Sequence, residues 1–136
     1  MPTREPAKNP CGTCPYRRDV PSGVWAEEEY AKLPEYDKPT GEQPLGLFHC
    51  HQQDGRLCAG WVGCHDMDNA LSIRMAQSLG WIEPDVIETV LDYGTDVPLW
   101  ASGAEAAEHG LREVDEPSWE ARRKIDVLIR KAARRD

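Results

Sequence analysis

Four cysteines in this chain are spaced like the ligands of a metal ion. Cys11 and Cys14 form a C-x-x-C, and Cys50 and Cys58 follow as a second pair with seven residues between them. Both sulfurs of a C-x-x-C can face one ion, and four thiolates complete the tetrahedral site of a structural zinc. We therefore expect these four side chains to form one metal centre that ties the first half of the chain together.

Other possible ligands lie close to this set in the sequence. His51 follows Cys50 directly and is the best substitute ligand, which would give a site of three cysteines and one histidine. Cys64 and His65 come shortly after the second pair and either replace a ligand or stay outside the site. A single cysteine is often a small buried apolar residue, which is the simplest interpretation of Cys64.

The spacing leaves the identity of the metal open. The seven residues between Cys50 and Cys58 exceed the two to four that are common in zinc ribbons. Four cysteines also ligate a 4Fe–4S cluster, and Pro15 creates a Cys-Pro step that ferredoxin motifs share. Structural zinc is the first expectation, and a 4Fe–4S redox or sensor protein is the alternative. A metalloenzyme with an open coordination position at His51, His65 or Asp66 is the least favoured hypothesis.

Composition indicates one small domain with a thin core. The chain has 136 residues, a single Phe, and 11 each of Gly and Pro. A structural metal contributes most to folding where the apolar core is small. We expect a cytoplasmic protein with no membrane-spanning segment, because the sequence has neither a secretory signal nor a long apolar run. Thiols stay reduced in that compartment, and an odd number of cysteines also argues against a closed disulfide framework. A bridge such as Cys11–Cys50 is the alternative for a secreted chain.

The charge is unevenly distributed. The chain carries a formal net charge of -8, of which residues 119–136 contribute +4 and the remainder -12. So acidic a body argues against a nucleic-acid-coating surface. The basic segment is either a solvated helix face, which is the favoured interpretation, or a contact surface for an acidic macromolecular partner.

The motifs of common enzyme classes are absent. The chain has no P-loop, no dinucleotide fingerprint, no H-E-x-x-H and no nucleophile elbow. Pro10 precedes the C-x-x-C as in zinc deaminases, but their H-x-E is missing. We therefore expect a non-enzymatic interaction or regulatory module.

The first half of the chain predicts an α+β arrangement. Residues 1–10 are expected to be flexible, residues 11–65 to form the metal-binding half, and residues 25–33 to form a short helix. Residues 45–48 and 57–63 read as two strands of a hairpin, with Asp54-Gly55 at the tip of its turn. Such a hairpin would bring Cys50 and Cys58 together.

The second half predicts helices, over 66–110 and 117–134. Asp66 is expected to cap a helix over 67–79 that Gly80 ends. Pro84 begins the next helix, and Ser102-x-x-Glu105 is a capping box for a helix ending near residue 110. The last helix carries an apolar stripe: Ala121, Ile125, Leu128 and Ala132.

Three blocks of the sequence also resemble a known family. CGTCPYR, FHCH and LCAGW are similar to the C-x-x-C-P-[WY]-R, F-x-C-H and C-x-G-[WF] blocks of small uncharacterised proteins from actinobacteria and their phages. The resemblance spans roughly residues 11–110. It implies a shared core at Cys11, Cys14, Cys50, His51 and Cys58 and no established activity. Cys64 and the basic helix lie outside that pattern.

Overall fold

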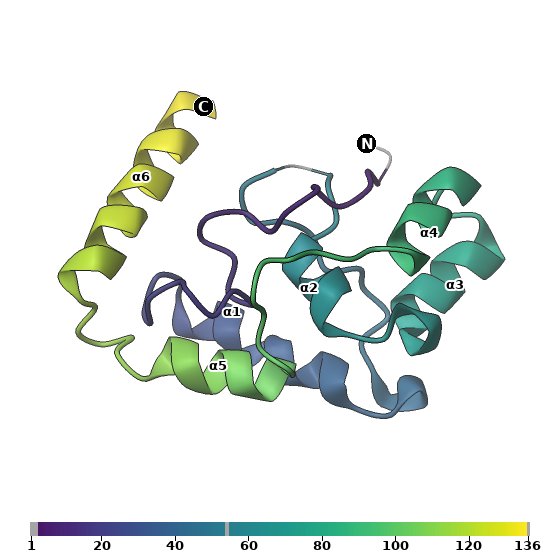
Figure 1. The fold of residues 1–136 in the computed structure, drawn as a ribbon, viewed down its shortest axis with the longest axis horizontal. Helices are drawn as coiled ribbons and strands as arrows, with labels where there is room; N and C mark the ends of the chain where they lie inside the picture. The colour runs from purple at the N-terminus through teal and green to yellow at the C-terminus, as the bar shows by residue number, and fades with distance from the viewer. Residues whose placement is uncertain (1–2, 54, 136) are drawn as a thin grey trace.

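Helices are the regular secondary structure of the part of the chain that the structure describes, and loops and turns connect them. The computed structural model describes residues 3–53 and 55–135. Within them lie six α-helices and three short 3-10 helices, η1 to η3, with no strand (Figure 1). In chain order they are α1 (Glu27–Ala31), η1 (Leu33–Asp37), η2 (Thr40–Glu42), α2 (Ala59–Cys64), η3 (Met67–Asn69), α3 (Leu71–Leu79), α4 (Pro84–Leu91), α5 (Gly103–Leu111) and α6 (Trp119–Arg135).

The predicted α+β class and its hairpin are wrong. His49 and Leu57 form an isolated antiparallel bridge, and the amide of Cys58 donates to the carbonyl of Phe48 at 2.9 Å. The amide of Cys50 also donates to the carbonyl of Arg56 at 2.8 Å, but no strand forms in the described residues, and the chain turns into helix α2 directly after Cys58. The expected turn tip lies partly outside the described residues, since Asp54 is not among them.

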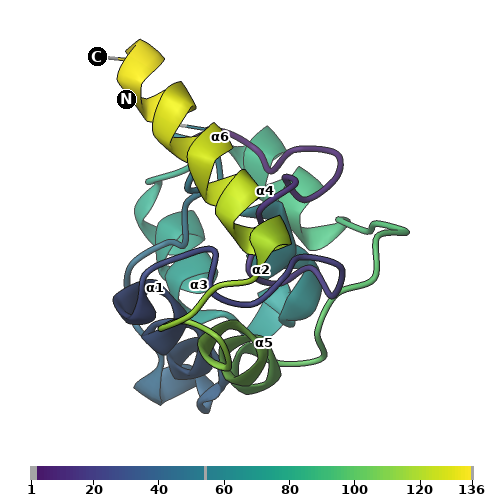
Figure 2. The same cartoon turned by 90° about the vertical axis from the view of Figure 1, so that its left-hand side faces the viewer.

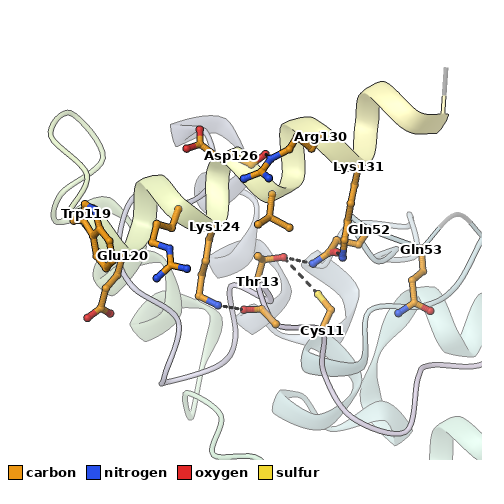
Figure 3. A pocket seen from close by; sticks show the side chains of 13 residues that line it. Cys11, Thr13, Gln52, Gln53, Trp119, Glu120, Lys124, Asp126, Arg130 and Lys131 are labelled. Carbon is orange, nitrogen blue, oxygen red and sulfur yellow. Dashed lines mark hydrogen bonds between the residues drawn. The ribbon is translucent and has the colours of Figure 1, made fainter.

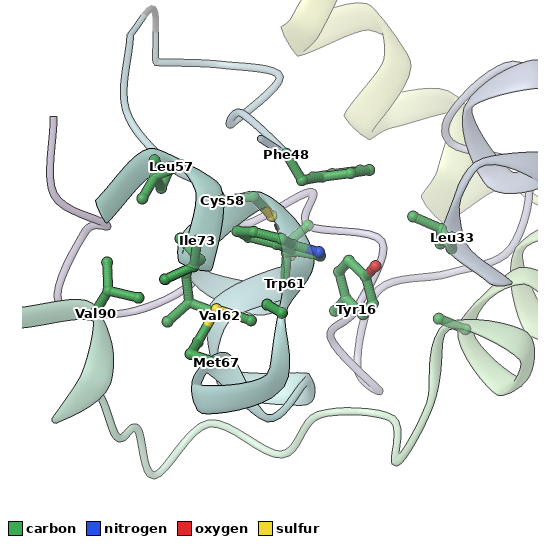
Figure 4. Packing of buried hydrophobic residues seen from close by; sticks show 14 of the residues in the cluster. Tyr16, Leu33, Phe48, Leu57, Cys58, Trp61, Val62, Met67, Ile73 and Val90 are labelled. Atoms are coloured by element: carbon green, nitrogen blue, oxygen red, sulfur yellow. Dashed lines mark hydrogen bonds between the residues drawn. The ribbon is translucent and has the colours of Figure 1, made fainter. Parts of the chain in front are cut away.

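Helix α2 forms the centre of the hydrophobic core. Trp61 is fully buried, and its ring is stacked with that of Phe48, with ring centres 6.3 Å apart (Figure 4). The ring of Tyr36 packs edge-to-face against Trp61, with centres 5.4 Å apart. Such aromatic pairs add to the stabilisation from buried area. Large buried side chains thus come from both halves of the chain and make one core. The most enclosed are Tyr16, Tyr30, Leu33, Leu57, Trp61, Ile73 and Val90.

Helix α5 packs against α1 and η1, and two side chains cap its N-terminus. The side chain of Ser102 accepts the amide of Glu105 at 3.1 Å, which confirms the predicted cap. The carboxylate of Asp37 accepts the amides of Gly103 and Ala104, each at 2.8 Å. A carboxylate at this end also matches the helix dipole.

The predicted helix over 67–79 is divided in two. Asp66 does cap, but it caps η3, accepting the amide of Asp68. Ala70 then adopts extended backbone angles, and α3 begins only at Leu71. Gly80 ends α3 with a φ of 69°, a left-handed conformation that glycine adopts without strain. On α3, Ile73 and Ala76 are buried in the core, and Leu79 at its end is exposed.

Helix α6 packs mainly through its first half. Ala121 is fully buried against Val20 and Val24, and Leu128 lies at the edge of that small cluster. Beyond it the ribbon of the helix stands apart from the rest of the fold (Figures 1 and 2), and the long side chain of Lys131 reaches back to Gln52. Ala132, which the predicted stripe included, is exposed. In the described residues, no helix combines the length and apolar character needed to cross a membrane.

Candidate metal centre

The fold brings the four predicted cysteines together as two pairs. Cys14 Sγ lies 3.9 Å from Cys58 Sγ, and the thiol of Cys11 is hydrogen-bonded to that of Cys50. Each pair joins the C-x-x-C loop to a residue beside the isolated bridge, since Cys50 follows His49 and Cys58 follows Leu57. All four are free thiols. Among residues 3–53 and 55–135, no three or more His, Cys, Asp or Glu side chains already converge as an assembled ion site.

Within each pair, one sulfur is favoured as thiolate and the other as thiol. Hydrogen bonding from Cys50 lowers the pKa of Cys11 to about 6, against the opposing effect of burial. In the same way Cys58 lowers the pKa of Cys14. The two donors shift the other way, because losing the proton would break the pair and leave a buried charge, so the pKa of Cys50 and that of Cys58 are raised.

Backbone amides point at all four sulfurs. Thr13 donates to Cys11, and Gln52 and Gln53 donate to Cys50. Such donors stabilise negative charge on sulfur, and they lower the pKa of the thiol that accepts them. The loop geometry therefore suits thiolates rather than apolar cysteines.

The deeper pair receives its donors from the C-x-x-C loop and from α2. The amides of Tyr16 and Gly60 donate to Cys14, and the amide of Trp61 donates to Cys58. Gly60 allows this approach. A Cβ at that position would overlap Cys14 Sγ and would lie 2.8 Å from the Cβ of Tyr16. Only glycine, which has no Cβ, lets α2 lie so close to Cys14 in the C-x-x-C loop.

The alternative ligand His51 is engaged elsewhere. Its Nε2 lies 2.6 Å from the carboxylate of Glu29, and its ring packs 4.5 Å from that of Trp25. It therefore holds α1 against the loop that carries Cys50.

Cys64 and His65 lie at a different cavity, of about 350 Å³, beside Asp37 and Asp66. Burial raises the pKa of Cys64 to about 12, which keeps it a thiol. Burial lowers the pKa of His65, whose Nε2 is 3.2 Å from the hydroxyl of Tyr16. The structure does not pair either residue with the four clustered cysteines.

Helix α6 contacts the C-x-x-C loop, a feature that no local sequence signal indicates. Lys124 Nζ donates to the carbonyl of Gly12 at 2.9 Å. Lys131 Nζ donates to Gln52 Oε1 at 2.8 Å, and Gln52 in turn donates to Thr13 Oγ1 (Figure 3). Thr13 Oγ1 lies 3.8 Å from Cys11 Sγ. A chain of polar contacts thus runs from the basic helix to Cys11.

Comparison with known proteins identifies a family without assigning an activity. No curated protein and no solved structure matches this chain. A family model described as a family of unknown function (DUF6283) matches residues 6–125, which include all five cysteines and only the start of α6, up to Ile125. The chain therefore belongs to this family of unknown function.

Proposed function

We propose that this protein is a metal-binding module in which Cys11, Cys14, Cys50 and Cys58 together hold one structural Zn²⁺. The observation that carries the proposal is the 3.9 Å separation of Cys14 Sγ and Cys58 Sγ, from segments 44 residues apart in the sequence. The second thiol pair and the amide donors around all four sulfurs support it.

The sulfur separation favours zinc over an iron–sulfur cluster. With Zn–S bonds of about 2.3 Å, the sulfurs of a tetrahedral site lie about 3.8 Å apart. Cysteine sulfurs around a 4Fe–4S cubane lie roughly 6–7 Å apart. The buried pair already has the zinc spacing. Cys11 and Cys50, which are half-buried, would move toward this pair to complete the site.

Zinc would replace the protons that the two pairs now share. Cys50 and Cys58 hold their protons tightly in the free protein, as their raised pKa values indicate. Zn²⁺ with four thiolates carries a net charge of −2, which the amide donors and the nearby Lys124 would offset. Metal binding would be coupled to folding, because its ligands come from three loop segments around a thin core.

A site filled by four protein ligands leaves no position for substrate, which favours an interaction or regulatory role over catalysis. We place this module in the reducing cytoplasm, where thiols persist. We also propose that the actinobacterial and phage relatives share the three cysteine blocks because these blocks carry the four ligands. The basic helix α6 is the proposed contact surface for a partner.

Anaerobic purification followed by elemental analysis and visible absorption tests the metal. We expect a colourless protein with one zinc per chain, and intense thiolate charge-transfer bands after substitution with Co²⁺. A brown protein with iron and acid-labile sulfide would establish the cluster instead. A metal-free protein with Cys14 and Cys58 oxidised to a disulfide would reject both.

Single substitutions test the ligand set. Cys14→Ser and Cys58→Ser should abolish stoichiometric metal binding and lower the melting temperature. Cys64→Ser is the matched control, because Cys64 faces the separate cavity beside Asp37. Loss of metal in the control as well would place Cys64 in the site and overturn this assignment.

A further inference from the structure

A cleft separates α6 from the C-x-x-C loop. Its volume is about 680 Å³, within the range of small-molecule sites. One wall is the basic face of α6, and the other contains Cys11, Thr13 and the two glutamines that follow His51 (Figure 3). Four cations line it, Arg123, Lys124, Arg130 and Lys131, against two carboxylates, Glu120 and Asp126.

The two lysines have structural partners in this cleft. Lys124 binds the carbonyl of Gly12, and Lys131 binds the side chain of Gln52. These contacts hold α6 over the loop and place two positive charges beside the cysteines. The two lysines would thus supply the positive charge that offsets the net negative charge of a four-thiolate zinc centre.

The two arginines that line the cleft contact only their own helix, Arg123 the ring of Trp119 and Arg130 the carbonyl of Asp126, in the interactions of the described residues. Neither Arg123 nor Arg130 forms an ion pair with a carboxylate among the described residues. They are seven residues apart on α6, which places them on one face about 10.5 Å apart along the helix. The Arg123 guanidinium lies 4.8 Å from the ring centre of Trp119, whose side chain is 69% exposed at one end of the cleft.

We propose that this cleft binds a small anion carrying a chain of phosphate groups, with Arg123 and Arg130 as its two anchoring cations. Arginine presents planar N–H donors that match phosphate oxygens, and two anchors two turns apart fit a di- or triphosphate better than a single phosphate. A long polyanion such as duplex DNA is disfavoured, because it would meet the acidic body, which carries −12 outside residues 119–136. The phosphate chain belongs to an inorganic polyphosphate or to a nucleotide, and the exposed Trp119 is placed to stack on a base in the second case.

Isothermal titration of the full-length protein with tripolyphosphate and with ATP tests this site. We expect binding of at least one, weakened about tenfold or more in the double variant Arg123→Gln/Arg130→Gln. The control double variant Arg74→Gln/Arg122→Gln removes the same charge from outside the cleft and should change affinity less than about threefold.

The arms of the experiment distinguish the two sources. If the ligand is a nucleotide, Trp119→Ala should weaken the binding of ATP and not that of tripolyphosphate. If the ligand is an inorganic polyphosphate, Trp119→Ala should leave both affinities unchanged. Absence of binding of either anion at millimolar concentration, or equal losses in both double variants, would overturn the proposal. Metal content is measured before and after each titration, so failure of the anion site is separate from failure of the zinc site.

Discussion

Gly60→Ala is expected to damage the cysteine cluster, although alanine favours helices. Gly60 lies in α2, and replacing glycine by alanine inside a helix ordinarily stabilises by about 1 kcal/mol. Here the added methyl group would overlap Cys14 Sγ and press on Tyr16. Both neighbours are buried, at 1% and 0% exposure, so neither can move aside freely.

Overpacking of this kind costs about 1–3 kcal/mol, and it exceeds the gain in helix propensity over most of that range. The expected result is a net loss of up to about 2 kcal/mol in unfolding free energy, measured by urea denaturation. The same shift of Cys14 should reduce the bound metal per chain.

Two glycines provide matched controls. Gly12→Ala lies in the C-x-x-C loop, where an added Cβ meets nothing within 4 Å. Gly63→Ala lies in the same helix, where the nearest atom, at 2.8 Å, is the flexible end of Leu99. Both should retain metal. If Gly60→Ala keeps full metal binding and stability, the close packing of α2 on the C-x-x-C loop is refuted.

Three further predictions concern the elements around the site. Ser102→Ala removes the cap of α5 and should lower the unfolding free energy by about 1 kcal/mol in urea denaturation; no change would reject the cap. Asp37→Ala leaves the amides of Gly103 and Ala104 without their carboxylate and should cost about 1–3 kcal/mol in the same assay, and a loss below that of Ser102→Ala would contradict it. Burial lowers the pKa of His65 below the 6.5 of the unfolded chain, so the unfolded state binds more protons as the pH falls through 6.5, and stability falls with it. The urea midpoint should therefore drop less between pH 7.5 and 5.5 in His65→Gln than in the native chain, and equal drops would remove His65 as the cause.

Local signals in the sequence were sufficient for several helix ends. The cap at Ser102, the proline that begins α4 and the left-handed Gly80 each act within a few residues, so the sequence predicts them directly. The predicted hairpin failed for a longer-range reason. Residues 57–63 read as a strand, but Trp61 and Val62 are buried together as part of α2 in a core that also includes Tyr16 and Phe48. Tertiary packing decided the helix there, since short apolar runs suit either structure.

The sequence by itself determined which side chains can do chemistry, because cysteine type and spacing identify potential thiolate ligands without any knowledge of the fold. Only the tertiary structure decided how they pair, Cys14 with Cys58 and Cys11 with Cys50. It also placed the basic helix beside the C-x-x-C loop, through Lys124 and Lys131. These contacts join residues 39 to 112 positions apart in the chain. No local pattern encodes such contacts, because they depend on how the whole core closes around α2.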